Sequence, residues 1–205
     1  MIDNLDEKKY IKSIKDNIKK CDLVIVADYG HGIITPKINK LFKTFSKKIN
    51  LNCQINSFNK GFNSVSKFKS VNSIVMNENE LRNELKDKES DIENLCKKIK
   101  KKIKFKSLYV TRGKFGACLY RSNKFYYAPS FALENKDTIG AGDTFLSISS
   151  LTEHINCPPD LSLFLSSLYA SYSVLNIGNK ETLSFDNFLK IVHNLLGFSQ
   201  IDNIY

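Results

Sequence analysis

Hydrophobic and polar positions follow two different periods along the chain, and these periods predict helices and strands in alternation. Apolar residues three or four positions apart in 4–20 and 90–104 indicate amphipathic helices. Residues 22–27 and 107–111 are short apolar runs rich in β-branched side chains, which are typical of strands. We expect the strand at 22–27 to be buried on both faces, as in a parallel sheet.

The same reading predicts the remaining elements. Further strands are expected at 51–55, 73–76, 117–120 and 124–128. Further helices are expected at about 36–49, 143–154, 160–175 and 184–196, and another is expected to begin within 78–81. This order predicts an α/β fold with a largely parallel central sheet. Because the chain has no internal repeat and no linker-like segment, we expect a single domain over residues 1–205.

Polar residues close four of the predicted strands: Asp28, Asn56, Asn77 and Thr111. The carboxyl ends of parallel strands meet at one edge of the sheet, and open α/β sheets bind their ligands at that edge. The sequence therefore predicts a ligand site at this edge.

The amino-acid composition argues against several classes of protein. Hydrophobic residues make up 42% and charged residues 25% of the chain, which is ordinary for a globular protein. Its apolar runs are much shorter than the roughly 20 residues of a membrane span, and the N-terminus does not resemble a signal peptide. The five cysteines form no CxxC pair. We expect free thiols, no membrane association and a cytoplasmic location.

The net charge of +10 suggests nucleic-acid binding as an alternative function. However, Arg82, Arg112 and Arg121 are the only arginines among the 31 basic residues. Proteins that recognise bases and phosphates favour arginine for its bidentate hydrogen bonds. We therefore interpret the charge as a lysine-rich composition and expect no nucleic-acid partner.

The run D-T-I-G-A-G-D at residues 137–143 carries the strongest chemical signal. Its glycines leave the backbone open where a helix is expected to begin, and the N–H groups of a helix N-terminus bind phosphate. A carboxylate at Asp143 would repel that anion, but it is useful as a base that deprotonates an attacking hydroxyl. The alternative is a helix start at which Asp143 is only the N-cap.

This run resembles the signature of the PfkB (ribokinase-like) carbohydrate kinases, D-T-x-G-A-G-D, without a substitution. The resemblance implies ATP as phosphoryl donor and Asp143 as catalytic base. It also implies that the backbone of Gly140, Ala141 and Gly142 forms the anion hole for the transferred phosphoryl group. Asp137 then lies near a site for a monovalent cation such as K⁺.

Two shorter motifs occur upstream in the family's order. Asn77 and Glu80 match its N-x-x-E motif, which organises Mg²⁺ and phosphate through water, although a capped helix start explains the pair equally well. Thr111, Gly113 and Gly116 match a T-x-G-x-x-G strand end that contacts the nucleotide, and a plain hairpin turn is the alternative. No P-loop motif is present in the sequence.

A narrower resemblance concerns the sugar. Residues 22–32, 52–57 and 61–63 are similar to the heptose-phosphate kinase domain of bifunctional kinase/nucleotidyltransferases. This similarity implies that Asp28 and Asn56 lie near the sugar site. A polar strand end that serves a turn is the alternative for Asp28.

The family resemblance implies a ribokinase-like three-layer sandwich without the family's N-terminal strands and β lid. We expect an ATP-dependent kinase that phosphorylates a hydroxyl of a sugar or sugar phosphate. The alternative is a nucleotide-binding half-enzyme or inactive remnant that needs a partner chain for its sugar site. A partner chain or a homo-oligomer is accordingly expected.

Overall fold

The structure is a computed structural model that describes residues 4–55, 63–131, 140–175 and 184–195. Its strands are β1 (Val24–Asp28), β2 (Ile49–Cys53), β3 (Ser73–Asn77), β4 (Ser107–Thr111), β5 (Ala117–Arg121) and β6 (Lys124–Ala128). Its helices are α1 (Asn4–Lys20), α2 (Pro36–Thr44), α3 (Glu78–Leu85), α4 (Ile92–Lys100), α5 (Ala141–His154), α6 (Pro159–Leu175) and α7 (Phe185–Leu195).

The six described strands form one sheet whose spatial order, β1 to β6, is the order of the sequence. The first four strands are parallel, and β5 and β6 form an antiparallel hairpin at the end of the sheet. The predicted α/β fold with a largely parallel sheet is confirmed. Asp28 pairs with Cys53, and Asn77 pairs with Thr111, so the carboxyl ends of these strands are aligned.

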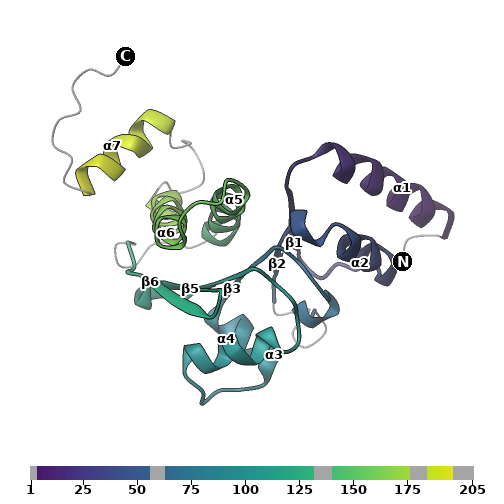
Figure 1. Ribbon diagram of the computed structural model, residues 1–205, viewed down its shortest axis with the longest axis horizontal. Coiled ribbons are helices and arrows are strands. Elements are labelled where there is room, and N and C mark those ends of the chain that lie inside the picture. Colours follow the sequence, from purple (N-terminus) through teal and green to yellow (C-terminus); the bar gives the residue numbers. More distant parts are fainter. Residues whose placement is uncertain (1–3, 56–62, 132–139, 176–183, 196–205) are drawn as a thin grey trace.

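Helices cover both faces of the sheet, which gives three layers (Figure 1). Helices α3 and α4 lie on one face, and α5 and α6 lie on the other. Ile74 and Met76 pack into the core on the α3–α4 side, whereas Val75 between them packs with α5 and α6. A strand of continuous apolar residues is therefore buried on both faces, as parallel strands commonly are.

Strand β1 departs from this pattern. Val26 is buried in the core cluster that also contains Ile38 and Phe42 of α2, but Ile25 is 40% exposed and Ala27 is also exposed. The prediction that this strand is buried on both faces was wrong. Among the described strands β1 has only β2 as a neighbour, so it lies at the edge of the sheet.

Strand β2 lies two residues earlier than expected, and α2 ends at Thr44 instead of about residue 49. Ile49, Leu51 and Cys53 point into the core, while Asn50 and Asn52 point to the other face. Both amides are buried and form hydrogen bonds: Asn50 Oδ1 accepts from Ser73 Oγ at 2.7 Å, and the Asn52 side-chain N–H donates to the carbonyl of Val75 at 2.9 Å. Strand propensity disfavours Asn, which explains the misplaced prediction.

Candidate active site

Asp143 lies in the first turn of α5, the helix that crosses the sheet above β1, β2 and β3. Its carboxylate accepts a hydrogen bond on each oxygen. The Tyr29 hydroxyl donates to Oδ2 at 2.9 Å, and the Gln54 side-chain amide donates to Oδ1 at 3.3 Å. Because Tyr29 follows β1 and Gln54 follows β2, Asp143 lies at the carboxyl edge of the sheet, where the strand ends predicted a site.

The N-terminus of α5 is open. Gly140 adopts a left-handed conformation with φ of 85°, and α5 has no side-chain cap within the described residues. By contrast, Thr35, Asn77 and Asp91 cap α2, α3 and α4. A Cβ atom at Gly140 would meet no described atom within 4 Å, and the same holds at Gly142. The first turn of α5 can therefore receive an external anion close to its backbone.

The Asp28 side chain is engaged in local structure. It is 4% exposed, forms an ion pair with Lys67 and accepts the Gly30 backbone N–H at 3.0 Å. These contacts agree with the alternative of a strand end that serves a turn, and a contact between Asp28 and sugar stays a prediction. Asn56 and Asp137 lie outside the described residues.

Asn77 and Glu80 form a reciprocal capping box at the start of α3. Asn77 Oδ1 accepts the Glu80 N–H at 2.8 Å, and the Glu80 carboxylate accepts the N–H groups of Asn77 at 2.8 Å and Ile55 at 3.3 Å. Burial raises the pKa of Glu80, and the two backbone hydrogen bonds offset only part of that rise. The structural alternative is therefore realised, and a role toward magnesium stays a prediction.

The end of β4 carries the two other glycine positions. Gly116 has φ of 77°, and a Cβ there would lie 2.0 Å from the carbonyl oxygen of Ala128. Its own carbonyl accepts the Arg112 N–H at 2.7 Å, which closes the turn after Thr111. Gly113 also has a positive φ, of 54°, but a Cβ there would meet no described atom within 4 Å. The close approach of the Ala128 backbone is therefore sufficient to explain the glycine at position 116, and a contact between this turn and a nucleotide stays a prediction.

An ion pair at this edge was missed by the sequence reading. Glu78 lies between Arg112, at 2.8 Å, and Arg82, at 2.6 Å. Burial alone would raise the pKa of Glu78, but the two guanidinium groups hold it below its usual value. The Arg112 guanidinium and the Lys114 amine also lie over the Phe115 ring, which is 65% exposed.

Sequence reasoning also missed the contacts of Tyr29 and Gln54 with Asp143. Both residues stand directly after a strand, inside segments already noted for their resemblance to heptose-phosphate kinases. Their position at the carboxyl edge was the available signal.

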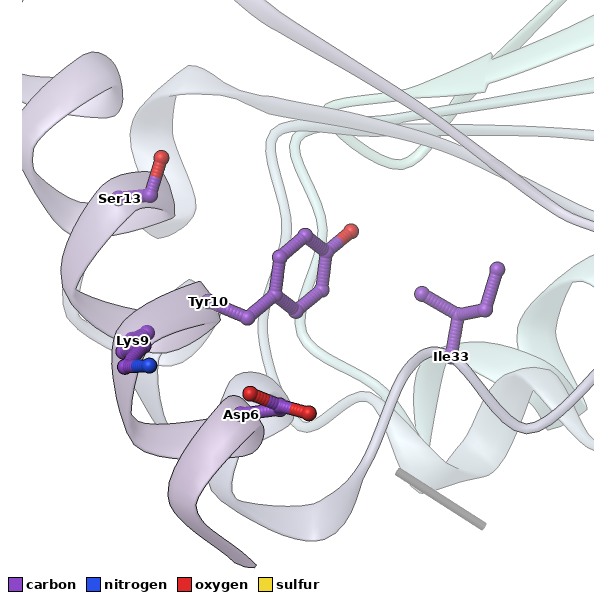
Figure 2. Close-up of a pocket in the computed structure, with 5 residues that line it drawn as sticks. All are labelled: Asp6, Lys9, Tyr10, Ser13 and Ile33. Atoms are coloured by element: carbon purple, nitrogen blue, oxygen red, sulfur yellow. The ribbon is translucent and has the colours of Figure 1, made fainter. Parts of the chain in front are cut away.

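A separate hollow lies between α1 and the segment after β1, and Figure 2 shows Tyr10 and Ile33 facing each other across it. Asp6, Lys9 and Ser13 complete its lining, and it includes none of the predicted site residues.

Among the helices of the described ranges, none combines the length and the hydrophobicity that a membrane span requires.

Comparison with known proteins identifies the family of this chain and the class of its fold. Residues 4–181 match the pfkB family carbohydrate kinases. The chain belongs to this family. No curated protein matches it.

Solved structures with the same fold include phosphofructokinase-2 from Escherichia coli in complex with potassium, with a TM-score of 0.71 at 16% identity. Ribokinase from Arabidopsis thaliana, complexed with ribose and ATP, has a TM-score of 0.71 at 18% identity. The alignments cover 91% and 88% of this chain. They cover 62% of the phosphofructokinase and 58% of the ribokinase, so the chain spans about 60% of their length.

Proposed function

We propose that the chain is an ATP-dependent kinase that phosphorylates a hydroxyl group of a sugar or sugar phosphate. The observation that carries the proposal is the placement of Asp143 beside an open helix N-terminus, at the carboxyl edge of the sheet. A base and an anion site in contact are what phosphoryl transfer to an alcohol requires. Family membership supports the same reaction.

In the proposed reaction, Asp143 accepts the proton of the acceptor hydroxyl. The acceptor oxygen forms a bond to the γ-phosphorus of ATP, and the bond from that phosphorus to the β–γ bridging oxygen breaks, so ADP leaves. The backbone N–H groups at Gly140, Ala141 and Gly142 stabilise the negative charge on the transferred group. A positioned base contributes on the order of 10²–10⁴ in rate.

The nucleotide would lie toward the β4 end, where Thr111, Gly113 and the exposed Phe115 meet the edge of the sheet. Magnesium would neutralise charge on its phosphates. Glu80 suits a hydrated ion only, because each oxygen already accepts a backbone N–H. In addition, no cluster of three acidic, His or Cys side chains suited to a metal occurs in the described ranges. A monovalent cation near Asp137 remains part of the proposal.

For the acceptor, we propose a heptose phosphate. The similarity of residues 22–32 to heptose-phosphate kinases supports this choice. Phosphorylation of heptose phosphate in preference to ribose, fructose and fructose-6-phosphate, measured as ADP release, is the expected result. A preference for one of the other acceptors would contradict the heptose assignment and leave the kinase proposal intact.

A second candidate is a nucleotide-binding unit that is active only with a partner chain. The exposed outer side of β1 favours it, because Ile25 at that edge is 40% exposed. ATP binding without sugar-dependent ADP release is the result that would favour this candidate.

The test of the kinase proposal is Asp143→Asn. This change removes the base but keeps a side chain of the same size, so we expect turnover to fall by about 10²-fold or more. ATP affinity, measured by calorimetry, should stay within about twofold. Asp160→Asn is the matched control, because Asp160 is an exposed acid in the first turn of α6. Turnover that survives Asp143→Asn would contradict the proposed base.

A further inference from the structure

The two side chains that contact Asp143 lie outside the D-T-I-G-A-G-D run and have been given no role so far. Tyr29 is 114 residues and Gln54 is 89 residues away from Asp143 in the sequence. We propose that Tyr29 and Gln54 are positioning residues that hold the Asp143 carboxylate in the orientation needed for proton transfer. This inference rests on the proposed function.

The geometry of the two hydrogen bonds carries the proposal. They reach different oxygens of one carboxylate, Oδ2 from Tyr29 and Oδ1 from Gln54. The terminal torsion of an aspartate is otherwise broad, so two donors on opposite oxygens fix the plane of the group. Each carboxylate oxygen has two lone pairs, so one on Oδ2 is left to accept the proton of the substrate hydroxyl.

The backbone that carries the two donors is tied together. The carbonyl of Asp28 accepts the N–H of Gln54 at 3.0 Å and the side-chain amide of Asn63 at 3.0 Å. The same Asn63 amide donates to the carbonyl of Gln54 at 3.1 Å. The Asp28 carboxylate also fixes the turn through the N–H of Gly30. Asp28 therefore acts through the backbone that presents Tyr29, which accounts for its burial next to the site.

The phenol at position 29 stays a donor at neutral pH. Its hydrogen bond to Asp143 raises the pKa of Tyr29 above the usual value of 10.0, because a phenolate would face a carboxylate. Tyr29 is 39% exposed, so its side chain is accessible to substrate and solvent. An accessible tyrosine that contacts a distant acid is better explained by the site than by core packing.

The first experiment measures turnover of Tyr29→Phe and Gln54→Met, which remove the donors but keep the side-chain length. We expect kcat to fall by about tenfold or more for each, since a misplacement of 1 Å can cost about 10²-fold. The KM for ATP should stay within about twofold. Tyr10→Phe is the matched control, because Tyr10 is 40% exposed and lies on α1.

The second experiment places Tyr29→Phe in the Asp143→Asn background. In that background no carboxylate is left for Tyr29 to orient, so the double variant should have the same residual turnover as Asp143→Asn alone. An equal loss in both backgrounds would show a general structural role and would overturn the proposal.

The third experiment tests the contact without relying on activity. Ultraviolet titration of the chain minus that of Tyr29→Phe isolates the phenol at position 29. Its pKa should lie above 10.0 in the wild-type chain and fall toward that value in Asp143→Asn. No difference between the two would overturn the contact and the proposal with it.

These outcomes separate the two proposals. A wild-type chain without turnover on any sugar acceptor would contradict the proposed function, and the positioning role with it, even if the titration showed the contact. Full turnover of both Tyr29→Phe and Gln54→Met would contradict the positioning role alone.

Discussion

At the scale of single residues, Glu80 combines an observed role in the stability of α3 with a proposed role toward magnesium. Its buried carboxylate completes the capping box of α3 and accepts the N–H of Ile55. The motif that suggested magnesium binding and the motif of a capped helix are the same four residues. Stability and turnover measured on one variant can separate the two roles.

We predict that Glu80→Gln gains stability relative to the wild-type chain as the pH rises. Burial raises the pKa of Glu80 above its ordinary value of 4.5. The folded wild-type chain therefore holds the proton more tightly than the unfolded chain, and it loses stability as pH rises through the raised pKa. Glutamine does not ionise, so the Glu80→Gln chain does not lose stability in this way. Urea unfolding measured between about pH 4 and pH 8 checks this, because a carboxyl group with a raised pKa ionises within that range.

Glu89→Gln is the control, because Glu89 is exposed, and it should follow the wild-type chain at every pH. If the free energy of unfolding of Glu80→Gln minus that of the wild-type chain stayed constant or fell with rising pH, the prediction would be wrong. A loss of turnover in the stable Glu80→Gln chain would support a role beyond capping.

Residue roles were only partly predictable from the sequence. The motif places Asp143 at a helix start, as the structure confirms. Its partners Tyr29 and Gln54 could not be predicted, because they meet it only through the pairing of β1 with β2 beneath α5. Asp28 was predicted as a site residue because it ends a strand, but it is the neighbouring Tyr29 whose side chain contacts Asp143.

At the scale of elements, the turn between β4 and β5 shows how a single position can be fixed by packing. A Cβ at Gly116 would overlap the carbonyl of Ala128 at 2.0 Å. The hairpin of β5 and β6 passes directly against this turn, so the backbone cannot move away without disturbing the sheet.

We predict that Gly116→Ala destabilises the chain by more than about 2 kcal/mol, through backbone strain and overlap with Ala128. Gly113→Ala is the matched control, with a positive φ but no described atom within 4 Å, and it should cost about 1 kcal/mol. Denaturant unfolding measures both. Equal losses would show that strain from the positive φ, and not the close approach, dominates.

Element types were largely predictable, and the failures have a physical cause. The helix at Asn4–Lys20 and the strand at Ser107–Thr111 fall on the expected residues because their periodicity is strong. The predicted position of β2 was two residues too late because Asn50 and Asn52, which strand propensity disfavours, form one face of the strand. Their buried hydrogen bonds depend on neighbours in β1 and β3, which a single-sequence pattern does not reveal.

At the scale of the whole molecule, the edge at β1 differs from the rest of the sheet. Ile25 is 40% exposed on β1, although it lies in an apolar strand. An apolar strand edge promotes association with other chains. The predicted burial of this strand failed because local sequence cannot tell how many neighbours a strand has.

We predict that Ile25→Lys weakens self-association, because it places a charge on the strand edge. Light scattering over a concentration series should show a smaller increase in apparent mass than for the wild-type chain. Ile33→Lys is the control, since Ile33 is 49% exposed but lies outside the strands. An equal effect of both changes would attribute the result to net charge instead.

The order of the strands has a consequence for how the chain folds during its synthesis. Each described strand pairs with the next one along the chain, so the sheet grows by short closures that cost little entropy. Asp143 follows β6, the last of the described strands, and contacts Tyr29, which is 114 residues away in the sequence. A nascent chain can therefore build its sheet during synthesis, while the proposed active site is complete only when α5 docks. Turnover would then report complete folding more strictly than secondary structure does.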